Sequence, residues 1–166
     1  MRLTRPLPPG SVIGILGGGQ LGRMLALAAA RLGFRCHILA PRGDNPALYV
    51  ANRHTEARYD DLSALQSFAD AVDVVTYEFE NVPAETAAYL AERVPLAPGA
   101  EILAISQDRL TEKTFLSELG IGISTFAAVD QNQNLVRQEM AVNFFEQSFR
   151  SVVVDLTCDD DLARLA

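Results

Sequence analysis

Short apolar runs alternate with amphipathic segments along most of the chain. The run at 12–16 is almost wholly apolar, which is typical of a strand that is buried on both faces of a parallel sheet. Residues 20–32 carry leucine, methionine and alanine at helical spacing, and Gly33 is suited to end that helix. The alternation of strand and helix predicts an α/β fold with a doubly wound, mainly parallel sheet.

The same patterns predict the remaining elements. Further strands are expected at 34–39, 72–77 and, more weakly, at 57–59 and 94–96. Further helices are expected at 48–51, from Asp61 through Ala69, from Pro83 to about Arg93, from Pro98 through Ile105, and at 109–119 with Asp108 as its cap.

The pattern weakens beyond residue 130, where a helix is expected at 135–149 and a strand at 151–156. The order of elements indicates three parts. These are a Rossmann-like domain at 1–97, a helical linker at 98–130 and an atypical α/β tail at 131–166.

The composition is that of a folded protein with a hydrophobic core, because hydrophobic residues make up 49% of the 166 residues. The formal net charge is −7 and no basic block occurs, which argues against nucleic acid and anionic membrane surfaces as partners. No apolar run is long enough to span a bilayer, and residues 1–10 lack the apolar core of a signal peptide, so a cytoplasmic location is expected. The two isolated cysteines make neither a disulfide framework nor a zinc site, and no metal site is predicted.

Glycine residues cluster directly after the first predicted strand. Glycine lets the backbone turn sharply and approach a ligand, and amides at the start of a helix can face an anion or a polar group. The spacing of Gly17, Gly19 and Gly22 fits the dinucleotide-binding pattern. The second strand ends without the acidic residue of a NAD site, but Arg42 could meet the 2′-phosphate of NADP. Two interpretations of the glycine cluster therefore stay open. The protein is an NADP-binding oxidoreductase, or the glycines serve only a tight turn and close helix packing.

Three sequence blocks give a more specific indication. They are GGGQLGRM at 17–24, YEFENVP at 77–83 and QDRLTEK at 107–113. In this order and spacing they closely resemble the amino-terminal part of the 5-(carboxyamino)imidazole ribonucleotide synthase family, which are ATP-grasp enzymes of purine biosynthesis. The segment DNPALYVANRH at 44–54 is similar to the same family, and the resemblance extends over roughly residues 10–130.

The resemblance implies an activity. Enzymes of this family use ATP and bicarbonate to carboxylate the exocyclic amine of 5-aminoimidazole ribonucleotide, with magnesium on the ATP phosphates. The family also implies a homodimer. A formate-using glycinamide ribonucleotide transformylase is a related alternative, but that enzyme carries Glu where this chain has Gln20 and lacks the FEN of the second block.

Candidate site residues lie in the crevice expected at the carboxyl ends of the strands. Gly19, Gln20 and Leu21 lie at its mouth, where the resemblance implies that the aminoimidazole nucleotide binds. Glu78 and Glu80 follow the fourth strand and could accept a hydrogen bond from the substrate amine. Glu78 could also act as a catalytic residue by helping to take the proton of that amine. Alternatively, either glutamate caps the next helix or pairs with an arginine.

Basic and histidine side chains give further candidates. Arg109 matches the family position that is expected to contact the phosphates of ATP, although it could instead pair with Glu112. Lys113, one turn further on, is expected to be a solvated helix residue. His37 is expected to be structural, and His54 has no visible acid–base partner.

The tail departs from the family after about Asp130. It contains no lysine and no glycine, so it cannot supply the lysines and the glycine-rich flap with which an ATP-grasp module holds ATP. The chain is expected to be either a truncated or frame-altered product or a short relative that has lost catalysis. In both cases we expect no carboxylation by this polypeptide alone. A non-catalytic binding or assembly domain stays open as a function.

Overall fold

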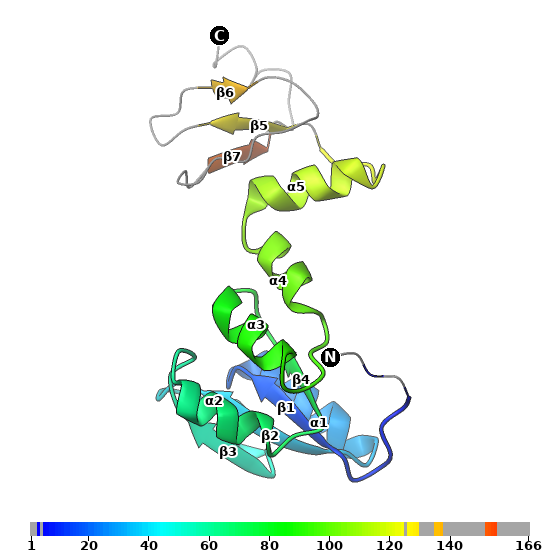
Figure 1. Cartoon of the computed structure of the whole chain (residues 1–166), viewed down its shortest axis with the longest axis vertical. Coiled ribbons are helices and arrows are strands. Elements are labelled where there is room, and N and C mark those ends of the chain that lie inside the picture. Colours follow the sequence, from blue (N-terminus) through cyan, green and yellow to red (C-terminus); the bar gives the residue numbers. More distant parts are fainter. Residues whose placement is uncertain (1–2, 4, 125, 130–134, 138–151, 156–166) are drawn as a thin grey trace. The chain divides into compact units, whose positions relative to one another are not determined.

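Four parallel strands form a sheet in the first part of the chain, in the order β3-β2-β1-β4 (Figure 1). Their bounds are Val12–Leu16 for β1, Arg35–Ala40 for β2, Arg53–Glu56 for β3 and Val74–Tyr77 for β4. The computed structural model describes residues 3, 5–124, 126–129, 135–137 and 152–155. The chain divides into two compact units, 1–104 and 105–166, and each is described by itself.

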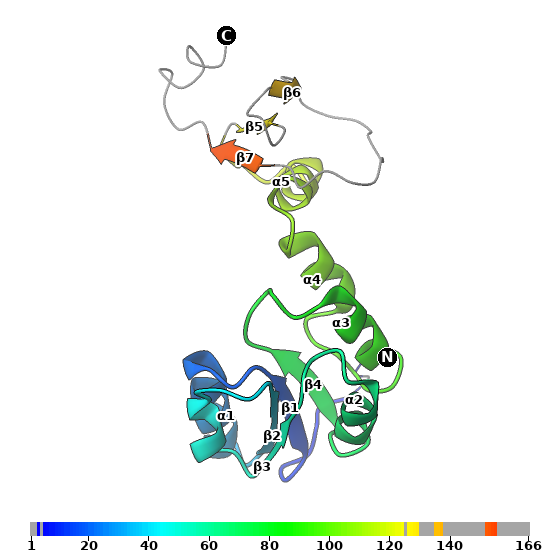
Figure 2. The same cartoon turned by 90° about the vertical axis from the view of Figure 1, so that its left-hand side faces the viewer.

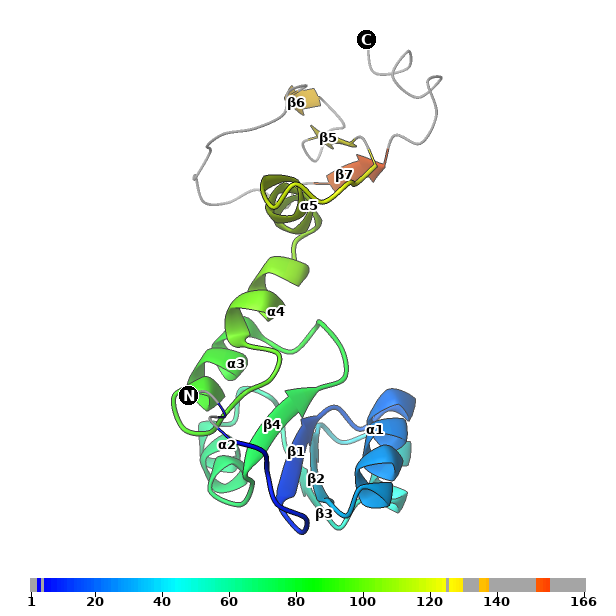
Figure 3. The ribbon, with the colours of Figure 1, turned by 90° about the vertical axis from the view of Figure 1, so that its right-hand side faces the viewer.

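Helices cover both faces of the sheet. α1 (Gln20–Arg31) and the 3-10 helix η1 (Pro46–Tyr49) pack on one face, and α2 (Leu62–Ala69) and α3 (Ala84–Ala91) pack on the other (Figures 2 and 3). α4 (Ala100–Ser106) follows α3 in the chain. The sheet is therefore doubly wound and parallel, as the sequence predicts, and its central strands are buried on both faces.

Two hydrophobic clusters hold the helices to the sheet. Successive side chains of a strand point to opposite faces, so neighbouring residues of β1 and β2 contribute to different clusters. Ile15 and Ile38 are buried on the side of α1, whereas Leu16 and Leu39 are buried on the side of α2 and α3. Each fully buried aliphatic side chain stabilises the fold by roughly 1.5–3 kcal/mol relative to exposure.

The strand register brings two distant segments together at the carboxyl edge of the sheet. β1 pairs in parallel with both β2 and β4, which places Leu16 opposite Leu39 and Tyr77. The residue that follows β1 and the residue that follows β4 each donate a further hydrogen bond to a neighbouring strand. The Gly17 amide donates to the Leu39 carbonyl at 3.0 Å, and the Glu78 amide donates to the Leu16 carbonyl at 3.2 Å. The glycine cluster and Glu78 therefore leave the sheet side by side.

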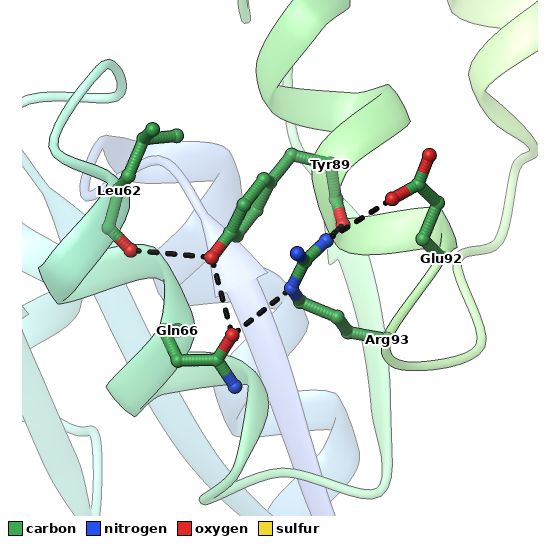
Figure 4. A network of polar contacts seen from close by, with 5 residues as sticks. All are labelled: Leu62, Gln66, Tyr89, Glu92 and Arg93. Carbon is green, nitrogen blue, oxygen red and sulfur yellow. Dashed lines mark hydrogen bonds and ion pairs between the residues drawn. The ribbon is translucent and has the colours of Figure 1, made fainter.

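A polar network joins α2 to α3 on the far side of the sheet from α1 (Figure 4). Gln66 Oε1 accepts hydrogen bonds from the Tyr89 hydroxyl at 3.1 Å and from Arg93 Nε at 3.0 Å. The Arg93 guanidinium also lies over the Tyr89 ring, 3.5 Å from its centroid, and donates to the Tyr89 carbonyl at 2.7 Å. One arginine thus combines a hydrogen bond to α2 with a cation–π contact within its own segment.

Two of the predicted strands have a different position or extent in the structure. The third strand lies at Arg53–Glu56 rather than at 57–59. It is an edge strand with three exposed residues out of four, so it lacks the apolar run from which buried strands are recognised. The strand expected at 94–96 is reduced to a single parallel bridge between Val75 and Leu96.

The second unit contains α5 (Arg109–Glu118) and an antiparallel sheet of β5 (Phe126–Val129), β6 (Leu135–Arg137) and β7 (Val152–Asp155), in the order β6-β5-β7. α5 contacts β7. β7 confirms the strand expected at 151–156. The helix expected at 135–149 is wrong at its start, because Leu135 and Arg137 pair with β5, and residues 138–149 lie outside the described residues.

No helix within the described ranges is both long enough and apolar enough to cross a bilayer.

Candidate functional site: a glycine loop closed by a carboxylate

The glycine cluster forms the loop between β1 and α1, and the carboxylate of Glu78 lies against it. Glu78 directly follows β4 and is half-buried. Its Oε1 accepts a hydrogen bond from the Gly19 amide at 2.8 Å, and its Oε2 accepts one from the Gly22 amide. Gly19 is the N-cap residue of α1 and provides no side-chain cap. Glu78 therefore satisfies amides that the first turn of α1 leaves without partners, from 59 residues away in the sequence.

Side chains at three of the loop glycines would collide with this arrangement. A Cβ at Gly17 would run into the Glu78 side chain, and its φ of +113° is one that other residues rarely adopt. A Cβ at Gly19 would lie 2.9 Å from Glu78 Oε1, and one at Gly22 would lie 2.7 Å from the Gly17 carbonyl oxygen. The close approach of Glu78 and of α1 accounts for the spacing of all three glycines.

This arrangement bears on the dinucleotide alternative. In dinucleotide-binding domains the pyrophosphate lies on the amides at the start of the first helix. Here the Gly19 and Gly22 amides bind the Glu78 carboxylate, so a phosphate would have to displace one negative charge or lie beside it. Arg42 is exposed in the loop after β2. The geometry argues against an NADP site at this loop.

Two further side chains, which the sequence patterns did not single out, interact with this region. Asn45 occupies the space that a side chain at Gly18 would need, and its Nδ2 donates to the Pro41 carbonyl at 2.7 Å. Burial and, to a smaller extent, the charge of Glu78 raise the pKa of Tyr59 to about 12, so its hydroxyl stays protonated at neutral pH. Local patterns around Asn45 and Tyr59 indicate a turn and a weak strand, and carry no signal of these long-range contacts.

A surface pocket of about 240 Å³ opens at the carboxyl edge of the sheet. Its lining comes from the loops that follow β2, β3 and β4, namely Pro41, Arg58, Tyr59, Asp60 and Pro83. Arg58 and Asp60 form an exposed two-bond ion pair with distances of 2.8 and 2.7 Å, and the hydrogen bond from Arg58 lowers the pKa of Asp60. The pocket thus combines the rings of Pro41, Tyr59 and Pro83 with one charged pair.

The structure brings most of the candidate residues to one place. Gly19 is bonded to Glu78, and Gln20 and Leu21 are the next two residues, both exposed at the start of α1. Leu21 is 56% exposed, because α1 packs on the sheet through Gly22, Ala26 and Ala29 and not through the leucine and methionine positions at helical spacing. Glu80 is exposed two residues after Glu78. Glu78 does cap a helix, but it caps α1 and not the helix that follows it.

Arg109 and Lys113 lie on α5, in the second unit. The Arg109 guanidinium pairs with Glu112, which is the alternative that the sequence left open, and Arg109 remains 58% exposed. The expectation for Lys113 is wrong: the residue is 4% exposed. Its Nζ donates to Ser124 Oγ at 2.9 Å and lies 5.3 Å from the centroid of the Phe126 ring, so the segment after α5 covers it.

The histidines have no catalytic arrangement in the described part of the chain. His37 Nε2 lies 2.9 Å from Thr55 Oγ1, and its ring meets Phe68 edge-on at 4.9 Å, which confirms the expected structural position. Burial, aided by the charges of neighbouring basic groups, lowers the pKa of His37 to about 4. His54 is exposed. Among the described residues, no group of three or more His, Cys, Asp or Glu could hold a metal ion.

Comparison with protein families identifies the domain that carries this loop. The family model of the ribonucleotide synthetase preATP-grasp domain matches residues 11–107, which contain β1 to β4, the glycine loop and Glu78. The chain belongs to this family. The preATP-grasp domain thus coincides with the doubly wound sheet and its carboxyl-edge site.

Relatives of known name share this preATP-grasp domain. An N5-carboxyaminoimidazole ribonucleotide synthase from Brucella melitensis is 55% identical over 130 residues, which cover 78% of this chain and 36% of the relative. The similarity confirms the family resemblance that the three sequence blocks indicate. The chain spans about a third of the length of the curated synthases that it matches.

Solved structures show the same fold. An N5-carboxyaminoimidazole synthetase from Staphylococcus aureus complexed with ADP matches 75% of this chain and 34% of its own, with a TM-score of 0.69 and 41% identity. The Aspergillus clavatus N5-carboxyaminoimidazole synthase in complex with ADP and 5-aminoimidazole ribonucleotide matches 74% of this chain and 33% of its own, with a TM-score of 0.65 and 29% identity.

Proposed function

We propose that this preATP-grasp domain serves the ATP-dependent carboxylation of 5-aminoimidazole ribonucleotide by bicarbonate, as the amino-terminal part of an N5-carboxyaminoimidazole ribonucleotide synthase of purine biosynthesis. The similarity to synthases of that name supports the proposal. The observation that carries it is the glycine loop held by Glu78 at the sheet edge where open α/β sheets bind ligands, with the adjacent Gln20 and Leu21 exposed.

The exposed start of α1 offers the chemistry that a small nucleotide needs. The Gln20 carboxamide has two donors and an acceptor for hydroxyls or amines, and Leu21 provides apolar surface. A carboxylate oxygen has more than one lone pair, so Glu78 can accept from the substrate amine while it holds the loop, and Glu80 can do the same. The pocket lined by Tyr59 has the size for a ribose or a five-membered ring.

ATP would supply phosphoryl transfer to activate bicarbonate. Arg109 fits a role in holding its phosphates, because its exposed guanidinium begins α5 and its planar fork matches phosphate oxygens. The ion pair between Arg109 and Glu112 would have to break, which costs little free energy because the pair is exposed. The described residues do not fit a magnesium site, so no step of this domain is assigned to the metal. Bicarbonate as co-substrate, a homodimer and a cytoplasmic location complete the proposal.

Calorimetric titration of the 166-residue protein with 5-aminoimidazole ribonucleotide tests this function. We expect binding of that nucleotide, weaker binding of glycinamide ribonucleotide and none of NADPH, since Glu78 fills the anion position of the glycine loop. Gln20→Ala should weaken the affinity by about tenfold at most, the usual contribution of a neutral hydrogen bond. Arg31→Ala, at the opposite end of α1, is the matched control and should retain it.

The other functional classes give different results. Binding of NADPH without binding of the aminoimidazole nucleotide would refute the proposal in favour of an oxidoreductase. Self-association without binding of any of the three ligands would refute it in favour of an assembly domain.

A further inference from the structure

Both oxygens of the Glu78 carboxylate are engaged by the backbone of the glycine loop, at the Gly19 and Gly22 amides. We propose that Glu78 is a positioning residue, a built-in anion that fixes the backbone of residues 19–22 and thereby presents Gln20 and Leu21 to the ligand. This assignment differs from a catalytic base, because it acts through the loop before any ligand binds. The part that concerns the ligand rests on the proposed function.

The surrounding geometry supports such a role. Glu78 begins where β4 ends, and its own amide is still bonded to the Leu16 carbonyl at 3.2 Å, so its backbone is anchored to the sheet. Its side chain then crosses the space that side chains at Gly17 and Gly19 would fill. An anchored carboxylate in a space cleared of neighbouring side chains is a rigid support for the loop.

The charge of Glu78 matters as well as its shape. The first amides of a helix lack internal partners and carry partial positive charge, so a carboxylate binds them better than a neutral amide does. A glutamine at the same place has one oxygen acceptor, and its NH₂ group would face a backbone N–H. Glu78→Gln therefore keeps the volume of the side chain but cannot satisfy both amides.

The first test needs no variant. In the wild-type protein, nuclear magnetic resonance should detect scalar couplings through the hydrogen bonds, from the amide nitrogens of Gly19 and Gly22 to the carboxylate carbon of Glu78. Absence of both couplings in the folded protein would overturn the proposal.

The second test compares Glu78→Gln with Glu85→Gln, the same change at an exposed glutamate in the first turn of α3. Hydrogen exchange at the Gly19 and Gly22 amides should become roughly tenfold or more faster in Glu78→Gln, the factor that a hydrogen bond to a charged group typically contributes. Exchange at these amides should stay unchanged in Glu85→Gln. Unchanged exchange in folded Glu78→Gln would contradict the assignment.

Rescue by a small anion separates positioning from a general requirement for the side chain. Glu78→Ala should show fast exchange at the two amides, and added formate should slow it again because formate can bind the same N–H groups. Added formamide, a neutral molecule of similar shape, should not slow it. Equal effects of formate and formamide would count against a role that depends on charge.

Titration with 5-aminoimidazole ribonucleotide then links the loop to the ligand. Glu78→Gln should bind the nucleotide at least tenfold more weakly, and formate should restore affinity to Glu78→Ala. Loss of amide protection without loss of affinity would overturn the link to the ligand. If the wild-type protein does not bind the nucleotide, the proposed function fails, but the coupling and exchange measurements still decide whether Glu78 positions the loop.

Discussion

Replacement of Gly22 by alanine sets two opposing effects against each other. Gly22 lies in α1, where alanine is favoured over glycine by about 1 kcal/mol because glycine loses more backbone entropy on folding. However, Gly22 is buried, and a Cβ there would lie 2.7 Å from the Gly17 carbonyl oxygen and 3.1 Å from Glu78 Oε2. The Gly17 oxygen belongs to a backbone that is bonded to Leu39, so it cannot move aside independently.

The steric effect should win. Forcing an extra methyl group into a close-packed site typically costs about 1–3 kcal/mol. Displacing Glu78 from the Gly19 and Gly22 amides adds a further ~1.5 kcal/mol or more, because these hydrogen bonds involve a charged group. After the helix gain of about 1 kcal/mol is subtracted, a net destabilisation of roughly 2 kcal/mol remains. That value corresponds to a fall in melting temperature of about 8 °C for a domain of this size.

Urea and thermal unfolding, followed by far-ultraviolet circular dichroism, measure this difference. Gly43→Ala is the matched control, because a Cβ at Gly43 meets nothing within 4 Å and its φ lies outside the left-handed region. That variant should be unchanged or more stable by about 0.5 kcal/mol. A Gly22→Ala protein as stable as the wild type, or more stable, would refute the conclusion that packing determines this glycine.

Three other predictions follow from single contacts. Because burial lowers the pKa of His37 from 6.5 to about 4, the unfolded chain binds the extra proton, and up to ~3 kcal/mol of stability should be lost as the pH falls from 6.5 to 4. Unfolding measured across this range should show a clearly smaller loss in His37→Gln than in the wild type and in His54→Gln, since the carboxylates that titrate in the same range are common to all three proteins. Asp61→Ala should destabilise the protein by about 1 kcal/mol in urea unfolding, because Asp61 Oδ1 accepts from the Ala64 amide at 3.0 Å and caps α2. Arg93→Ala should destabilise it by roughly 1–2 kcal/mol through loss of the network between α2 and α3, whereas substitution of an exposed arginine outside such a network should have little effect.

The sheet could be predicted from the sequence where strands are buried on both faces. β1 shows a near-continuous apolar run, β2 is largely apolar, and α2 begins at a recognisable N-cap, Asp61. β3 could not be located in this way, since its exposed edge position leaves Arg53–Glu56 without an apolar pattern. The solvated position predicted for Lys113 is wrong for a related reason: the pattern within the helix contains no sign of Ser124 and Phe126, which contact the side chain from beyond the helix.

The glycine loop illustrates a deeper limit of local patterns. The spacing of Gly17, Gly19 and Gly22 indicates that side chains are excluded at these positions. It does not indicate which group occupies the space that the missing side chains leave. A pyrophosphate and a carboxylate both bind exposed helix amides, so the same glycines suit either occupant. Glu78 decides between them, and its position depends on the register of β4 beside β1. Only the pairing of strands far apart in the sequence shows that a carboxylate of the protein itself occupies the amides of this loop.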